Sequence, residues 1–210
     1  MEIFRTLRRG HDEAVKRSLD ALTGGCIIAF PTETFYGLGV KYDHPAALER
    51  LSALKKRPKD KAMPLIIGHR RLLPLIAAAV PPSAERLMDL FWPGPLTLIL
   101  PAKDTLSFHI TAGTGAVAVR IPGRSFALSL ARTLDFPITA TSANVSSQPP
   151  ADSAEAVSDY FGVSIDIIID CGKTPGTLPS TIVDATGERP VIVRRGMLPE
   201  KEIIRALQAC

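Results

Sequence analysis

The sequence predicts an α/β protein: a twisted, open sheet of mixed parallel and antiparallel strands with flanking helices, forming a single domain over residues 1–210. Two observations predict this class. Short apolar runs bounded by proline or glycine recur along the chain, and segments with apolar residues every three or four positions lie between them. In addition, 46% of the 210 residues are apolar, which is enough for one well-packed core.

The first half of the chain alternates predicted helices with predicted strands. One helix is expected over residues 12–22, where apolar side chains recur on one face and two glycines follow. The apolar run CIIAF, residues 26–30, predicts a buried strand. A second helix is expected to start at an Asp43 cap and to end before Pro58. Its last turn leads into three successive cations, Lys55, Lys56 and Arg57.

The rest of the chain continues this alternation and ends in closely spaced strands. The runs MPLIIG, PLTLIL, AVAVRIP and PITATSAN each predict a strand, and the last of them opens into a polar loop. Helices are expected over residues 83–91, 125–134 and 153–161, and from about 199 onward. The runs IDIIID, STIVDAT and PVIVRR predict three further strands, whose short links favour antiparallel pairing within a mixed sheet.

Composition narrows the chemistry. The formal net charge of +4 favours an anionic partner, such as a polyphosphate or nucleic acid. No segment approaches the ~20 apolar residues that span a bilayer and no signal peptide is apparent, so we expect a cytoplasmic protein without membrane contact. Cys26, Cys171 and Cys210 lie far apart, and the four histidines are scattered. We therefore expect neither a disulfide framework nor a protein-bound metal site.

Four polar clusters lie where predicted strands or helices end: PTETFYG, KKRPKDK, TSAN, and PST together with VRRG. Ligand groups gather at such ends in open α/β sheets. Each cluster alone also has a structural explanation, because cations stabilise the carboxyl end of a helix and Ser142 and Asn144 suit a turn. A local arrangement for a covalent nucleophile is absent. Together the clusters predict one basic, hydroxyl-bearing site.

The order and spacing of seven motifs resemble the YrdC-like family of L-threonylcarbamoyladenylate synthases. The motifs are FPTETFYGLG, KKRP followed by PLII, LFWPGPLTLIL, VAVRIP, TSANVS, STIVD and VRRG, and the resemblance runs from about Ala14 to Pro199. The length resembles that of the short, single-domain members. The resemblance implies an enzyme, a nucleotidyltransferase that condenses L-threonine, bicarbonate and ATP to threonylcarbamoyl-AMP and pyrophosphate. Downstream threonylcarbamoyl-transferase proteins would then modify tRNA.

The resemblance also implies site residues. Lys55 and Arg57 match the family's catalytic Lys-x-Arg pair, and the residues implied to bind ATP are Lys55, Arg57, Ser142, Asn144 and Arg194. Those implied to surround threonine are Thr32, Tyr36, Arg120, Ala140 and Ser180, with Arg120 on its carboxylate. Mg²⁺ is expected to arrive with ATP, held by substrate oxygens and water. As helix-end cations facing solvent, Lys55 and Arg57 are expected to matter far more for activity than for stability.

Three positions depart from the family pattern. Lys56 stands where the family usually has a small residue, so either Lys55 or Lys56 can be the lysine of the Lys-x-Arg pair. Gly68 separates PLII from His69, whereas a histidine usually follows this motif directly. Ala116 stands where a threonine is usual. Two other functions stay open. One is a YciO-like paralogue with a different substrate, and the other is a module that binds double-stranded RNA through a basic surface. Pyrophosphate release that depends on threonine would separate the enzyme from both.

Overall fold

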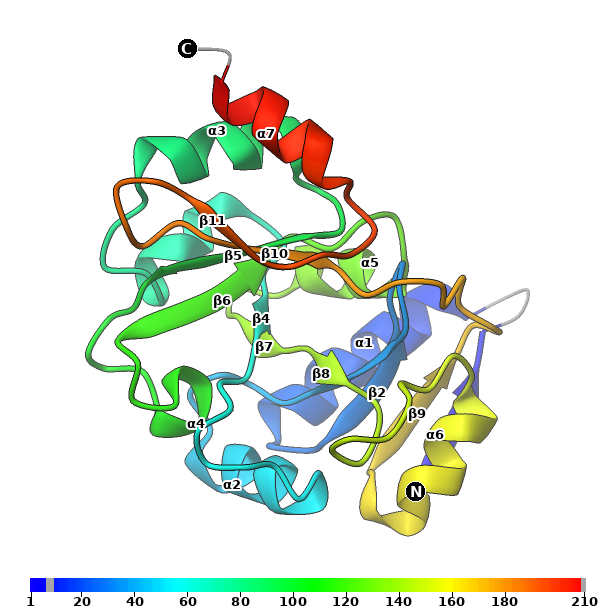
Figure 1. The fold of residues 1–210 in the computed structure, drawn as a ribbon. Coiled ribbons are helices and arrows are strands. Elements are labelled where there is room, and N and C mark those ends of the chain that lie inside the picture. The colour runs from blue at the N-terminus through cyan, green and yellow to red at the C-terminus, as the bar shows by residue number, and fades with distance from the viewer. Residues whose placement is uncertain (7–9, 209–210) are drawn as a thin grey trace.

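The strands of the protein form two sheets that face a common interior (Figure 1). The structure is a computed structural model, and it describes residues 1–6 and 10–208. Cys210 lies outside these residues. The five-stranded sheet has the order β1 (Glu2–Arg5), β9 (Ile167–Asp170), β2 (Ile28–Pro31), β3 (Tyr36–Gly39), β8 (Thr141–Ser142). The six-stranded sheet has the order β11 (Val191–Arg194), β10 (Thr181–Asp184), β5 (Leu96–Pro101), β6 (Ala116–Arg120), β4 (Leu65–Ile66), β7 (Ile138–Thr139).

Both sheets mix parallel and antiparallel pairs, which confirms the predicted class. In the first sheet β9 runs parallel to β1 and β2, whereas β3 runs antiparallel to β2 and β8. In the second, β10 is parallel to β5 and antiparallel to β11. The close spacing of the last strands therefore predicted one antiparallel hairpin correctly, while β9 and β10 went to different sheets.

Residues 138–142 join the two sheets. β7 belongs to the six-stranded sheet and β8 to the five-stranded one, with only Ala140 between them. The amide of Ala140 donates to the carbonyl oxygen of Pro64 at 2.9 Å, and the amide of Thr139 donates to that of Val40 at 2.9 Å. One short segment thus pairs with both sheets in turn, so the chain bends sharply at Ala140 and leaves a space between the sheets.

Helices cover the outer faces of the sheets, as Figure 1 shows. Their bounds are α1 (His11–Thr23), α2 (Pro45–Leu54), α3 (Pro82–Phe91), α4 (Phe108–Thr111), α5 (Phe126–Thr133), α6 (Ala154–Phe161) and α7 (Glu200–Gln208), with 3-10 turns η1 (Arg70–Leu75) and η2 (Gly162–Ser164). α1 packs on α5 and β2, and α3 packs on α7. None of these helices combines the length and apolar character that crossing a bilayer requires.

Local sequence explains most element boundaries and also the differences from prediction. Ser125 and Ser153 cap α5 and α6 as helix N-caps do, whereas α2 is capped by His44 rather than Asp43, because its Nδ1 accepts the amide of Ala47. β3 was not predicted as a strand, since glycine is rare in strands. Gly39 is required there because a Cβ would lie 2.6 Å from the Phe30 ring.

Candidate active site

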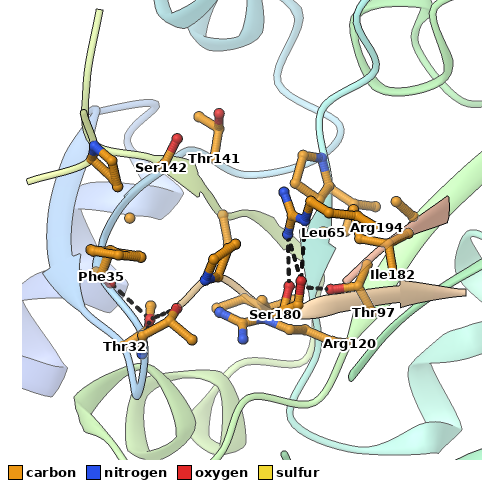
Figure 2. A pocket seen from close by; sticks show the side chains of 18 of the residues that line it. Thr32, Phe35, Leu65, Thr97, Arg120, Thr141, Ser142, Ser180, Ile182 and Arg194 are labelled. Atoms are coloured by element: carbon orange, nitrogen blue, oxygen red, sulfur yellow. Dashed lines mark hydrogen bonds between the residues drawn. The ribbon is translucent and has the colours of Figure 1, made fainter. Parts of the chain in front are cut away.

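A cavity of about 480 Å³ opens between the two sheets. Four cationic side chains line it, Arg57, Lys61, Arg120 and Arg194, and none of its described lining residues is acidic. Eight residues of the sequence-predicted site lie in its wall: Thr32, Tyr36, Arg57, Arg120, Ala140, Ser142, Ser180 and Arg194. Figure 2 shows several of them: Arg120, Ser142 and Arg194 come from β6, β8 and β11, while Thr32 directly follows β2 and Ser180 directly precedes β10. Segments far apart in sequence therefore build one basic hollow.

The turn between β2 and β3 supplies hydroxyls to one side of the cavity. The Thr32 hydroxyl donates to the carbonyl oxygen of Phe35 at 2.7 Å (Figure 2), and it accepts the amide of Thr34 at 3.1 Å. Tyr36 is fully buried, and its hydroxyl donates to the Gly172 carbonyl at 2.8 Å. Burial, reinforced by Asp170, raises the pKa of Tyr36, so its hydroxyl stays protonated. The turn is a rigid hairpin, and Tyr36 anchors the 171–180 segment.

Arg120 ends β6 and points into the cavity. Its Nη1 donates to Oε1 of Glu33, and the two side chains are only 9% and 12% exposed. Burial lowers the pKa of Arg120, whereas the charge and hydrogen bond of Glu33 raise it. The guanidinium is therefore a buried cation held at one nitrogen by a carboxylate, and its remaining N–H groups are available to a ligand.

Arg194 lies on β11 and lines the cavity next to Ser180. Its Nη2 donates to the Ser180 carbonyl oxygen at 2.8 Å and to the Ser180 hydroxyl at 3.1 Å, and that hydroxyl lies 2.9 Å from Oγ1 of Thr97 (Figure 2). Burial lowers the pKa of Arg194, and repulsion from Arg120 adds to this. The Arg120 and Arg194 guanidinium groups are therefore neighbours in the cavity wall, and Arg194 offers its charge to an anionic ligand.

Arg57 follows α2 and contacts Thr141, the residue that precedes Ser142. Its Nε donates to the Lys61 carbonyl at 2.8 Å, its Nη1 to the Thr141 hydroxyl at 3.2 Å, and its Nη2 to the Ala62 carbonyl. Burial lowers the pKa of Arg57. These bonds to neutral oxygens fix the guanidinium without cancelling its charge.

Lys55 and Asn144 were expected at the ATP phosphates, but neither lies in the described cavity wall. Lys55 is 2% exposed, and its Nζ donates to the carbonyl oxygen of Ser142 and, at 2.7 Å, to that of Asn144. Asn144 uses its amide to hold the Gln148 carbonyl and its Oδ1 to accept the Ser142 hydroxyl at 2.6 Å. The expectation that Lys55 faces solvent is wrong. In this structure Lys55 holds the Ser142–Asn144 loop in place through these hydrogen bonds.

Burial, with repulsion from Arg57 and Lys61, lowers the pKa of Lys55 to about 7. The unfolded chain keeps this proton to about pH 10, so between these values the unfolded state binds more protons and the free energy of unfolding rises with pH. We expect the stability of wild type relative to Lys55→Met to rise by up to about 1.4 kcal/mol per pH unit from pH 7 to 9. Urea unfolding at pH 7, 8 and 9 measures this; a flat or falling difference contradicts it.

The three departures from the family pattern now have positions. Lys56 is exposed, with a left-handed φ of 48°, so the buried Lys55 and not Lys56 contacts the Ser142 loop. His69 precedes η1 and lies outside the described cavity wall. Ala116 begins β6, at the end of the strand opposite Arg120, and is also outside it.

Sequence reasoning missed several wall residues and one partner. Thr34, Lys61 and Thr97 line the cavity, and Glu33 pairs with Arg120. Thr34 and Glu33 stand inside the quoted motif PTETFYG, directly after Thr32, so their place next to a residue implied to bind threonine was the available signal. No comparable signal marked Thr97, because it lies within an apolar strand and is brought to Ser180 only by β5–β10 pairing.

The protein supplies no acidic metal cage here. Among residues 1–6 and 10–208, no group of three or more His, Cys, Asp or Glu side chains is placed to hold a metal ion. The cavity instead offers hydroxyls, carbonyls and cations, a donor set suited to anions.

Comparison with known proteins agrees with this geometry. The family model for Sua5, YciO and YrdC proteins, described as telomere recombination, matches residues 20–196. Threonylcarbamoyl-AMP synthase from Pyrococcus abyssi is 41% identical over 183 residues, covering 87% of this chain and 54% of that protein. Threonylcarbamoyl-AMP synthase from Bacillus subtilis is 37% identical over 194 residues, covering 92% of this chain and 56% of that protein. The chain thus spans just over half the length of these curated relatives.

A solved structure shares the whole arrangement of elements. The crystal structure of P. abyssi Sua5 complexed with L-threonine superposes with a TM-score of 0.94 at 37% identity, covering 99% of this chain and 61% of that one. The family model, these relatives and the shared fold lead to one conclusion: the chain belongs to the Sua5/YciO/YrdC family.

Proposed function

We propose that the protein is a threonylcarbamoyl-AMP synthase, which condenses L-threonine, bicarbonate and ATP with release of pyrophosphate. The observation that carries the proposal is the convergence of Arg57, Arg120 and Arg194 on one cavity that also presents the Thr32 and Ser180 side chains. Relatives that bear this enzyme's name support it. They favour it over a YciO-like paralogue with another substrate.

In the proposed reaction the threonine amine and bicarbonate form a carbamate and water. A carbamate oxygen then attacks the α-phosphorus of ATP, the bond to the β,γ-phosphates breaks, and pyrophosphate leaves with the electron pair. The participants carry negative charge, so gathering and aligning them is the protein's main task. The enclosed space between the sheets limits the access of water to the labile carbamate.

The geometry suggests a place for each substrate. Arg120 would hold the threonine carboxylate through its free N–H groups, with the Thr32 and Ser180 hydroxyls nearby. Arg57 and Arg194, which form no ion pair with any residue that the structure describes, would hold phosphates. Ser142 also lines the cavity and would contact the nucleotide, positioned by Lys55 and Asn144. Mg²⁺ would enter as part of the MgATP substrate.

The direct test is pyrophosphate release from ATP and bicarbonate by the purified protein, measured with and without L-threonine. Release that requires both threonine and bicarbonate supports the proposal. ATP turnover without threonine dependence, or none at all, contradicts it. Product identification by mass spectrometry distinguishes threonylcarbamoyl-AMP from AMP formed by hydrolysis.

Replacing the amino acid tests the pocket. A site that hydrogen-bonds the threonine hydroxyl leaves a buried polar group unpaired when valine binds. We expect kcat/KM for L-valine to be lower by about 10⁴-fold, and for L-serine, which lacks only a methyl group, by about 10- to 200-fold. The same pyrophosphate assay measures both. Equal use of valine and threonine contradicts hydroxyl recognition.

Contact with tRNA is a further part of the proposal. A groove of about 630 Å³ adjoins the cavity at Arg57 and Lys61, and it carries Lys56, Lys59 and His109. Such a basic groove suits a nucleic-acid backbone. Salt-sensitive RNA binding in the absence of threonine-dependent chemistry would instead favour the RNA-binding module.

A further inference from the structure

The three arginines of the cavity are not equivalent in charge. Arg57 and Arg194 are held by carbonyl and hydroxyl oxygens, and neither forms an ion pair with a described residue. Arg120 is paired with the carboxylate of Glu33. The Arg57 and Arg194 positions therefore present unbalanced positive charge, whereas the Arg120 position is close to neutral overall.

Glu33 directs its carboxylate to Arg120. Its Oε1 accepts Nη1 of Arg120, and its buried Oε2 has no hydrogen-bond partner among the described residues. The side chain fits against Gly123, where a Cβ would come within 3.1 Å of Glu33 Cγ. A buried carboxylate with an unsatisfied oxygen is costly, so its retention at this place calls for a reason other than stability.

We find this reason in the two kinds of ligand that the proposed reaction brings into one cavity, a polyphosphate and an α-amino acid. A polyphosphate carries several negative charges and is drawn to unbalanced cations. An α-amino acid is a zwitterion, so an arginine backed by a carboxylate can still bind its carboxylate without repelling its ammonium group. Without Glu33, Arg120 would add a second unbalanced cation next to Arg194 and would itself attract phosphate groups.

We propose that Glu33 is a specificity-determining residue that keeps phosphates away from Arg120 and so reserves this guanidinium group for a zwitterionic amino acid. This inference rests on the proposed function. Glu33 acts through Arg120, and the structure gives it no direct place in the cavity wall.

The test compares binding of two probes, L-threonine and inorganic pyrophosphate, by calorimetry with wild type and Glu33→Gln. The substitution keeps an acceptor for Arg120 and removes the charge. In Glu33→Gln we expect pyrophosphate to bind about tenfold more tightly and L-threonine about tenfold more weakly. Pyrophosphate should also displace threonine from Glu33→Gln competitively, whereas wild type should bind both together.

Two further variants separate charge from structure. Glu33→Asp keeps the charge and should keep the wild-type preference, while Glu188→Gln removes an exposed acid in the β10–β11 turn and should leave both affinities unchanged. Loss of both ligands in Glu33→Gln and Glu33→Asp alike, or an unchanged pyrophosphate affinity in Glu33→Gln, would overturn the inference. Wild type that binds no threonine would instead contradict the proposed function, so the two failures are distinct.

Discussion

Replacing Lys55 by methionine is expected to lower the free energy of unfolding by about 2–4 kcal/mol at pH 8, because two loop carbonyls lose their shared donor. At this pH the Lys55 side chain is largely a neutral amine, which still has two N–H groups for Ser142 and Asn144. Methionine fills the space without donating. Urea unfolding monitored by circular dichroism measures the loss.

The same substitution should lower pyrophosphate release by about 100-fold or more, because the Ser142–Asn144 loop would no longer be held at the cavity edge, and small misplacements are costly in catalysis. Lys56→Met is the matched control: its side chain is exposed and its φ of 48° is equally unfavourable for lysine and methionine. We expect its stability to change by less than about 0.5 kcal/mol. Equal effects at positions 55 and 56 would contradict the role of Lys55 in holding this loop.

Replacing Arg120 by methionine is expected to have the second large effect. Glu33 would be left as a buried carboxylate with no partner, and breaking such a pair costs about 3–5 kcal/mol. Threonine-dependent turnover should fall by at least about 100-fold, since the proposed carboxylate contact disappears. Thermal unfolding and the pyrophosphate assay at saturating ATP measure the two effects.

A double variant separates these two effects. Arg120→Met with Glu33→Leu removes both charges, and apolar replacement of a buried pair is often neutral for stability. We expect the double variant to regain most of the lost stability but none of the lost activity. Recovery of activity along with stability would mean that Arg120 has only a structural role.

The sequence predicted the architecture well where the pattern was strong. Apolar runs bounded by proline or glycine identified β5, β6, β9 and β10, and the helices expected over residues 125–134 and 153–161 are α5 and α6. β1 was missed because it is only four residues long and two of them are charged, and β3 because two of its four residues are glycine. Their strand form depends on pairing with β9 and β2, which no local window contains.

The site shows the same division between local and long-range information. Motif positions such as Thr32, Arg120 and Arg194 were predicted and do line one cavity. The orientation of Lys55 was not predictable, because the position of a cation after a helix looks the same whether it faces solvent or a loop 87 residues away. Glu33 was passed over as a turn residue, since only β6 brings it an arginine.

The passage of the chain from one sheet to the other at Ala140 has a consequence for when the cavity forms during folding. Residues 138–142 pair with both sheets, so neither sheet alone forms the complete cavity. Arg57 precedes this segment in the sequence and Arg194 follows it by about 50 residues. The cavity therefore forms only when both parts of the chain have folded together. Competence for binding should accordingly emerge as a late, all-or-none event in folding, with no partially active fragment along the way.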